Sequence, residues 1–200
     1  MTQSSPTFRG KSVYLLLALA VLALDQWTKW LVQEHLPLLV SRPLIPGFLN
    51  LTHVENTGVA FGLFAARGDL VRTWVLAGVG ILALVVVLIY FRRTPVEDRL
   101  LLTSLGLVLG GAVGNLLDRM MAGAVTDFID FYVGTYHWHT FNVADSAITV
   151  GLILMAWDAF RPREGVAPAG AGAAAGAPVW TTTHERGGAQ AGARSPRRGR

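Results

Sequence analysis

Residues 74–91 read Trp-Val-Leu-Ala-Gly-Val-Gly-Ile-Leu-Ala-Leu-Val-Val-Val-Leu-Ile-Tyr-Phe and contain no charged side chain. In a helix, roughly 20 such residues cross the hydrocarbon layer of a bilayer, which is about 30 Å thick. Three other segments are nearly as apolar, and they run from about residue 13 to 33, from Leu100 to Leu117 and from Phe141 to Trp157. The sequence therefore predicts an all-α membrane protein with four transmembrane helices.

The composition favours the same class. Hydrophobic residues make up 52% of the 200 residues and charged residues only 15%, a balance that is unusual in soluble domains. The net charge of +4 arises in the tail, residues 161–200, because residues 1–160 hold ten basic and eleven acidic side chains. No nucleic-acid-binding motif accompanies the basic tail, so no nucleic-acid partner is expected. The chain has no cysteine, which excludes disulfides, thiolate nucleophiles and cysteine-ligated zinc, and no cofactor is predicted.

Basic residues outside the apolar segments predict the orientation. The N-terminal segment 1–12, the loop 92–99 and the tail are richer in Lys and Arg than the linkers 34–70 and 118–140. The positive-inside rule then places both termini in the cytoplasm and the two linkers outside. We expect a helical domain over 13–160, followed by a disordered basic tail rich in Ala and Gly.

The first apolar segment has an alternative interpretation as a cleaved signal peptide, because it follows Arg9 and Lys11. Apolar sequence resumes after Asp25, however, and cleavage would discard both Asp25 and Lys29. A retained first helix is therefore preferred.

The outer linkers contain two segments with the composition of β-strands. Phe48–Val54 and Val125–Val133 are rich in β-branched and aromatic residues, and glycines punctuate both linkers. We expect these segments to form short strands on the outer surface of the membrane.

Polar side chains from three helices are predicted to share one layer near the outer surface, because the first and third helices end there and the fourth begins there. These residues are Asp25, Lys29, Asn115, Arg119, Asn142 and Asp145. Asp127 lies in the linker between the third and fourth helices, close to that layer. Carboxylates beside lipid are costly and indicate function. Asp127 and Asp145 are expected to form a carboxylate pair of the kind that activates water for peptide hydrolysis.

Structural roles are the alternative for several of these residues. Asp25 and Lys29 are four residues apart and can form an ion pair on one helix face. Asp118 and Arg119 can extend to water from the end of their helix. The helix dipole can explain Asp145 in a first turn, although it does not explain the nearby Asn142 and Asp127.

Other catalytic schemes find little support. The sequence has neither a Gly-x-Ser-x-Gly nor a His-Glu-x-x-His motif. His137 and His139 have a spacing suitable for two metal ligands on a strand, but no third ligand is evident, so no metal is predicted. A rival class is a non-enzymatic membrane protein that uses the polar layer as a proton path. A relay should cross the whole membrane, and the inner half of the helices lacks ionisable groups to continue one.

Five segments resemble the type II (lipoprotein) signal peptidases in order and spacing. The segments are Asp25–Lys29, Glu55–Gly62, Gly110–Arg119, Val125–Phe128 and Phe141–Asp145. Val59 stands where the family usually has Ala, and Gly62 stands where it often has Ser. Neither position corresponds to a catalytic group.

The resemblance implies a membrane aspartyl endopeptidase of the bacterial inner membrane, with its active site near the outer leaflet. Its substrates would be diacylglyceryl-modified prolipoproteins, cut immediately before the lipidated cysteine. Catalysis would use Asp127 and Asp145 without metal, and the strands would form a cradle over the cleavage site. Residues that line or support the site would be Asn56, Asn115, Arg119, Asn142, Asp25 and Lys29. Membrane lipid is the other expected partner, and a monomer is expected.

Overall fold

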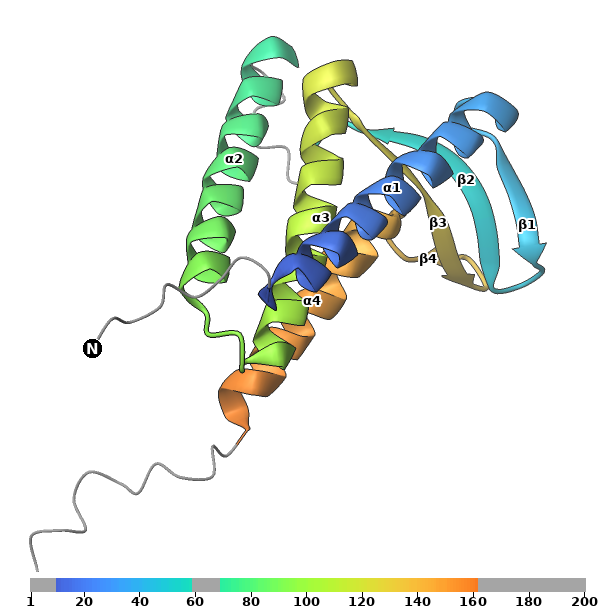
Figure 1. Ribbon diagram of the computed structural model, residues 1–200. Helices are drawn as coiled ribbons and strands as arrows, with labels where there is room; N and C mark the ends of the chain where they lie inside the picture. The colour runs from blue at the N-terminus through green and yellow to red at the C-terminus, as the bar shows by residue number, and fades with distance from the viewer. Residues whose placement is uncertain (1–9, 59–68, 162–200) are drawn as a thin grey trace, which may run out of the picture. The chain divides into compact units, whose positions relative to one another are not determined.

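The computed structural model describes residues 10–58 and 69–161 (Figure 1). Its elements are α1 (Ser12–His35), β1 (Ser41–Ile45), β2 (Leu49–Asn56), α2 (Asp69–Arg93), α3 (Arg99–Ala122), β3 (Val125–Val133), β4 (Tyr136–His137) and α4 (Val143–Phe160). Most of the predicted segment 1–12 and nearly all of the tail lie outside the described residues, as do Val59 and Gly62.

Four helices in the described part of the chain are long and apolar enough to cross a membrane. They span Ser12–His35, Thr73–Arg93, Arg99–Ala122 and Val143–Phe160, so the predicted four-helix membrane fold is confirmed. The last helix begins at Val143, two residues later than expected, because Phe141 forms a β-bridge with Ile129 and Asn142 is the N-cap.

Helix α3 packs against each of the other three helices (Figure 1). Its close approach to α1 depends on glycine, because a Cβ atom at Gly106 would lie 2.8 Å from the carbonyl oxygen of Tyr14. A Cβ atom at Gly110 would lie 2.5 Å from the carbonyl oxygen of Ala18. Small residues at intervals of four let two helix backbones meet in this way. This contact brings the later turns of α1 and α3, which carry polar side chains, next to each other.

The four strands form one antiparallel sheet in the order β1-β2-β3-β4. Strands β2 and β3 match the two predicted strand segments closely. Strands β1 and β4 were not predicted, because β1 contains Pro43 and β4 has only two residues. A proline is tolerated in β1 because this strand is at the edge of the sheet. The buried side chains of Val32 in α1 and of Leu36, the residue that caps the end of α1, pack against Phe128 and tie β3 to the end of α1.

Candidate active site

Asp127 lies in β3 and is only 2% exposed. Its Oδ2 atom accepts a hydrogen bond from Asn56 Nδ2 at 2.9 Å, and its Oδ1 atom accepts one from Asn142 Nδ2 at 2.7 Å. Asn56 ends β2, the strand paired with β3, whereas Asn142 precedes α4. The carboxylate is therefore held by two side-chain amides from different parts of the chain.

Asn142 links the two aspartates. Its Oδ1 atom accepts a hydrogen bond from the backbone N–H of Asp145 at 2.9 Å, and the backbone N–H of Asn142 donates to Asp145 Oδ2 at 3.3 Å. These reciprocal bonds form a capping box, which fixes the start of α4. The same Asn142 side chain donates to Asp127, so the helix cap also sets where Asp145 lies relative to Asp127.

Asn115 of α3 holds the other oxygen of Asp145. Its Nδ2 atom donates to Asp145 Oδ1 at 2.7 Å. Its Oδ1 atom accepts from Lys29 Nζ at 3.0 Å and from Asn142 Nδ2 at 3.2 Å. Because both donors point at the carbonyl oxygen, the amide of Asn115 is oriented with its N–H group toward Asp145.

Lys29 forms ion pairs with two carboxylates that are largely shielded from water. Its Nζ atom lies 2.7 Å from Asp25 Oδ2 and 2.7 Å from Asp118 Oδ2. Asp25 Oδ1 in turn accepts a hydrogen bond from the backbone N–H of Ala144 at 2.8 Å, which connects α1 to the first turn of α4. The predicted Asp25–Lys29 ion pair is present. The expectation that Asp118 extends to water is wrong, because its side chain is only 11% exposed and lies against Lys29.

Arg119 lies beside this network. Its Nη1 atom donates to the backbone carbonyl of Asn115 at 3.3 Å. Its Nε atom is buried without a hydrogen-bond partner among the described residues. Arg119 thus adjoins the polypeptide backbone that carries Asn115, and the described contacts do not join its guanidinium to Asp127 or Asp145.

The two aspartates line one pocket of about 580 Å³. Asn56, Trp138 and Phe141 also contribute to its wall, and α4 supplies further lining residues. A concave site of this size that holds ionisable groups is large enough to admit a ligand. The pocket would expose both carboxylates to the same reacting group.

Burial raises the pKa of Asp127 from its ordinary value of 3.8 to about 6. The hydrogen bond from Asn56 opposes this rise, and the negative charge of Asp145 adds to it. Asp127 therefore keeps its proton at a pH where an ordinary aspartate is ionised. A carboxylic acid beside a second carboxylate is the pairing that aspartic proteases use, because one group can donate a proton while the other accepts one.

Asp130 belongs to a separate cluster on the sheet. Its Oδ2 atom accepts a hydrogen bond from Asn50 Nδ2 at 3.0 Å, and His137 Nδ1 lies 2.9 Å from its Oδ1 atom. Burial alone would raise the pKa of Asp130, but the hydrogen bonds from Asn50 and His137 lower it overall. The side chain of His137 thus contacts Asp130. In the described segments, no group of three or more His, Asp or Glu side chains could hold a metal ion.

The family model of signal peptidase (SPase) II matches residues 17–161 of the chain. The chain belongs to this family. The lipoprotein signal peptidase of Desulforapulum autotrophicum is 47% identical over 142 residues, which cover 71% of this chain and 88% of that protein. The corresponding protein of Solibacter usitatus is 46% identical over 149 residues, which cover 73% of this chain and 89% of that protein.

A solved structure of a bacterial membrane enzyme has the same fold. It superimposes with a TM-score of 0.68 at 29% sequence identity, covering 81% of this chain and 100% of that one. Membership of the signal peptidase II family makes the chain a protease, and its four apolar helices make it a multi-pass membrane protein.

Two further residues contribute to the polar network of this signal peptidase II family member and were not predicted to do so. Gln26 Nε2 donates to Asp118 Oδ1 at 2.9 Å, so both oxygens of Asp118 face α1. The sequence did contain a feature that could have indicated the role of Asp118. Asp118 follows Asn115 by three residues, so both side chains lie on the same side of α3. His53 in β2 is also buried, and its Nδ1 atom lies 2.7 Å from the carbonyl oxygen of Leu36.

Proposed function

We propose that the chain is an aspartic endopeptidase that removes signal peptides from diacylglyceryl-modified prolipoproteins, with cleavage immediately before the lipidated cysteine. The observation that carries this proposal is the joint placement of Asp127 and Asp145 at one pocket, with Asn142 bonded to both residues. The names of the related lipoprotein signal peptidases support the choice of substrate. The carboxylate pair supports the aspartic type of catalysis.

Asp127 is the partner that carries the proton, because its pKa is raised to about 6. Asp145 is the second carboxylate of the proposed pair, and it lies in the first turn of α4. In the proposed reaction, Asp145 takes a proton from a water molecule as the water attacks the scissile carbonyl carbon. Asp127 donates its proton to the carbonyl oxygen, and the leaving amine later receives a proton from the pair.

The neighbouring amides orient the two catalytic groups. Asn56 and Asn142 both donate to Asp127, and Asn115 donates to Asp145. Lys29 acts indirectly through Asn115. Its hydrogen bond to the side-chain carbonyl oxygen of Asn115 keeps the amide N–H group directed at Asp145. Groups held in this way lose little entropy when the transition state forms.

The chain's charge distribution and its family support a proposed location. We propose a bacterial inner-membrane protein with both termini in the cytoplasm, so that the sheet and the aspartates adjoin the outer leaflet. Residues 13–160 are the proposed peptidase domain, and the tail is dispensable for cleavage. Reporter fusions after residue 97 should report cytoplasm, and fusions within 40–56 should report the outer side. The opposite pattern would overturn this orientation.

The function is tested by incubating the purified full-length protein in detergent with a lipid-modified prolipoprotein and determining the new N-terminus. We expect a lipidated cysteine at that position and no cleavage of the same precursor without its diacylglyceryl group. Asp127→Asn and Asp145→Asn should each lose nearly all turnover at normal abundance, because the amide cannot exchange the required proton. Near-normal turnover by either variant would defeat the proposed pair. Cleavage at another peptide bond would defeat the proposed substrate.

A further inference from the structure

A second pocket lies between α1 and the sheet, and it shares no lining residue with the pocket that holds the aspartates. Its volume is about 390 Å³. The buried side chains of Val32, Leu36 and Phe128 form its floor, and Leu31 and Leu51 extend the apolar lining. The interior of this second pocket therefore suits a hydrocarbon group.

Basic side chains occur at the exposed part of the second pocket. His35 is the last residue of α1 and Arg42 is in β1, and both are exposed. Arg42 forms no ion pair with a carboxylate in the segments that the structure describes. A guanidinium group binds phosphate with paired hydrogen bonds. The pocket thus offers a phosphate-binding group beside an apolar interior.

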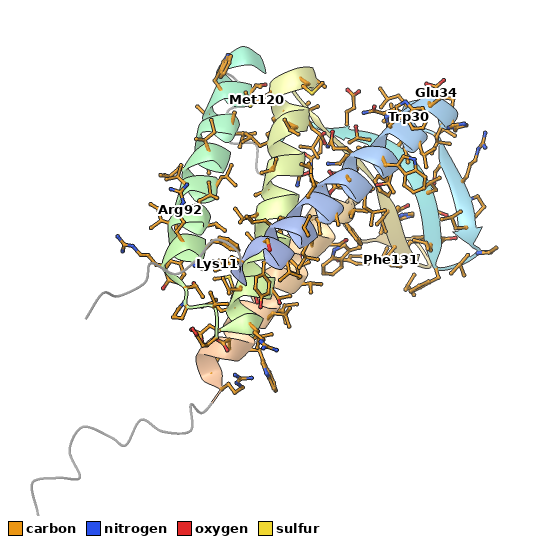
Figure 2. All side chains as sticks on the ribbon, in the orientation of Figure 1. Lys11, Trp30, Glu34, Arg92, Met120 and Phe131 are labelled. Carbon is orange, nitrogen blue, oxygen red and sulfur yellow. The ribbon has the colours of Figure 1, made fainter. Side chains whose placement is uncertain are left out.

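The second pocket lies at the end of the membrane-spanning helix α1. It is lined by the last turns of α1 and by strands that lie outside the four candidate spans. Trp27 and Trp30 on these turns are 56% and 53% exposed, and tryptophan is enriched where helices meet lipid headgroups. Figure 2 shows Trp30 and Glu34 at the end of α1 that adjoins the sheet, and Glu34 does not line the pocket. Arg42 is accordingly at the level of the headgroups.

We propose that the second pocket binds an anionic phospholipid of the surrounding bilayer. One acyl chain lies against Leu31, Leu51 and Phe128, and the phosphate binds Arg42. Phe128 follows Asp127 in β3, so a lipid that packs on Phe128 stabilises the strand that carries Asp127. This site lies outside the cleavage pocket, and its existence does not depend on the chemistry of the two aspartates.

The test uses the full-length protein, purified in a neutral detergent and depleted of lipid. The thermal unfolding midpoint and the number of lipids retained in native mass spectrometry are measured with phosphatidylglycerol and with phosphatidylcholine of the same acyl chains. We expect phosphatidylglycerol to raise the midpoint more. Arg42→Gln should abolish this preference and weaken phosphatidylglycerol binding by about tenfold or more, because a hydrogen bond between charged groups typically contributes at least that much to binding. The control is Arg92→Gln at the end of α2, far from Trp30 in Figure 2, and it should keep the preference.

Several other results would contradict the proposed lipid site. An unchanged preference in Arg42→Gln would overturn the proposal, and so would an equal loss in Arg92→Gln. A similar shift with inorganic phosphate alone would indicate an anion site without a lipid. Leu31→Trp, which fills the pocket, should reduce binding of both phospholipids, and unaltered binding would contradict the assigned location. Conversion of a dimer to a monomer by Leu31→Trp would assign the pocket to a second copy of the chain instead.

Discussion

Asp118 Oδ2 lies 2.7 Å from Lys29 Nζ, the same distance that separates Lys29 from Asp25. One ammonium group from α1 therefore pairs with a carboxylate on its own helix and with another on α3. All three side chains are largely shielded from water. Lys29 also bonds to Asn115, so the charge balance of this cluster is connected to the position of Asp145.

Loss of Lys29 should be more damaging than loss of Asp118. Lys29→Met keeps an unbranched apolar side chain one atom shorter but leaves two largely shielded carboxylates without their cation, and unpaired buried charge typically costs about 3–5 kcal/mol. Asp118→Asn leaves Lys29 paired with Asp25 and retains an oxygen for the bond from Gln26. Unfolding midpoints in detergent and cleavage rates measure both changes. Equal effects of the two variants would show that the charge of Lys29 is not what holds the cluster.

The sequence contains enough information to predict the Asp25–Lys29 pair, because the spacing of these residues on one helix fixes their proximity. The sequence does not indicate as directly that Asp118 of α3 also pairs with Lys29. Asp118 meets Lys29 only because α3 crosses α1 along glycines such as Gly110, and crossing geometry depends on the backbones of both helices. Contacts within a helix could thus be predicted from spacing alone. For this contact between helices, the sequence indicates only that Asp118 lies on the same side of α3 as Asn115, and the partner depends on how the helices cross.

The strands likewise differ in how well the sequence predicts them. The composition of Val125–Val133 predicts β3 correctly, because this segment is rich in residues that suit a half-buried sheet. The edge strand β1 is fully exposed and contains Pro43, so its sequence lacks a burial pattern. Asp127 and Asp145 could be chosen from their chemistry and the family resemblance. The helix cap through which Asn142 connects them required the position at which α4 begins.

Gly111 should be the glycine least able to accept a side chain where α3 meets α4. A Cβ atom there would collide with the carbonyl oxygen of Ala144, which belongs to the backbone and cannot move aside as a side chain can. Gly111→Ala should therefore separate α3 from the first turn of α4, lower the unfolding midpoint and reduce cleavage. The matched control is Gly78→Ala in α2, where a Cβ atom would meet nothing within 4 Å. If both variants behave alike, close packing at Gly111 is not required.

Asp130 should be separable from the proposed catalytic pair, Asp127 and Asp145. Asp130→Asn should retain most cleavage activity, because Asp130 is bonded to Asn50 and His137 and not to the amides that hold Asp127. It should nevertheless lower stability, by about 1–3 kcal/mol, since a charge-assisted contact with His137 is lost. Steady-state cleavage and thermal unfolding distinguish these effects. His137→Gln is the matching change on the other partner and should show the same pattern. A loss of turnover in Asp130→Asn as large as that in Asp127→Asn would contradict the assignment of the catalytic pair.

Activity should fall as the pH rises through the pKa of Asp127. That pKa is raised to about 6 by burial, and the proposed reaction requires the protonated form, so kcat/KM should decline about tenfold per pH unit well above this value. Stability should change in the same direction. Because the folded-state pKa exceeds the ordinary value of 3.8, the contribution of Asp127 is fully present below about pH 4 and is lost as the pH rises through about 6.

Comparing the stability of Asp127→Asn with that of the unaltered protein distinguishes the pH dependence caused by Asp127 from that caused by other ionisable groups. The variant lacks the titrating carboxylate, so its stability relative to the unaltered protein should improve between pH 4 and pH 7.5 by on the order of 3 kcal/mol. The asparagine also disturbs the bonds from Asn56 and Asn142, but that cost is the same at both pH values. Unfolding midpoints of both proteins across this range provide the measurement. A difference that does not vary with pH would mean that folding leaves the pKa of Asp127 at its ordinary value of 3.8, and it would contradict the assignment of Asp127 as the proton donor.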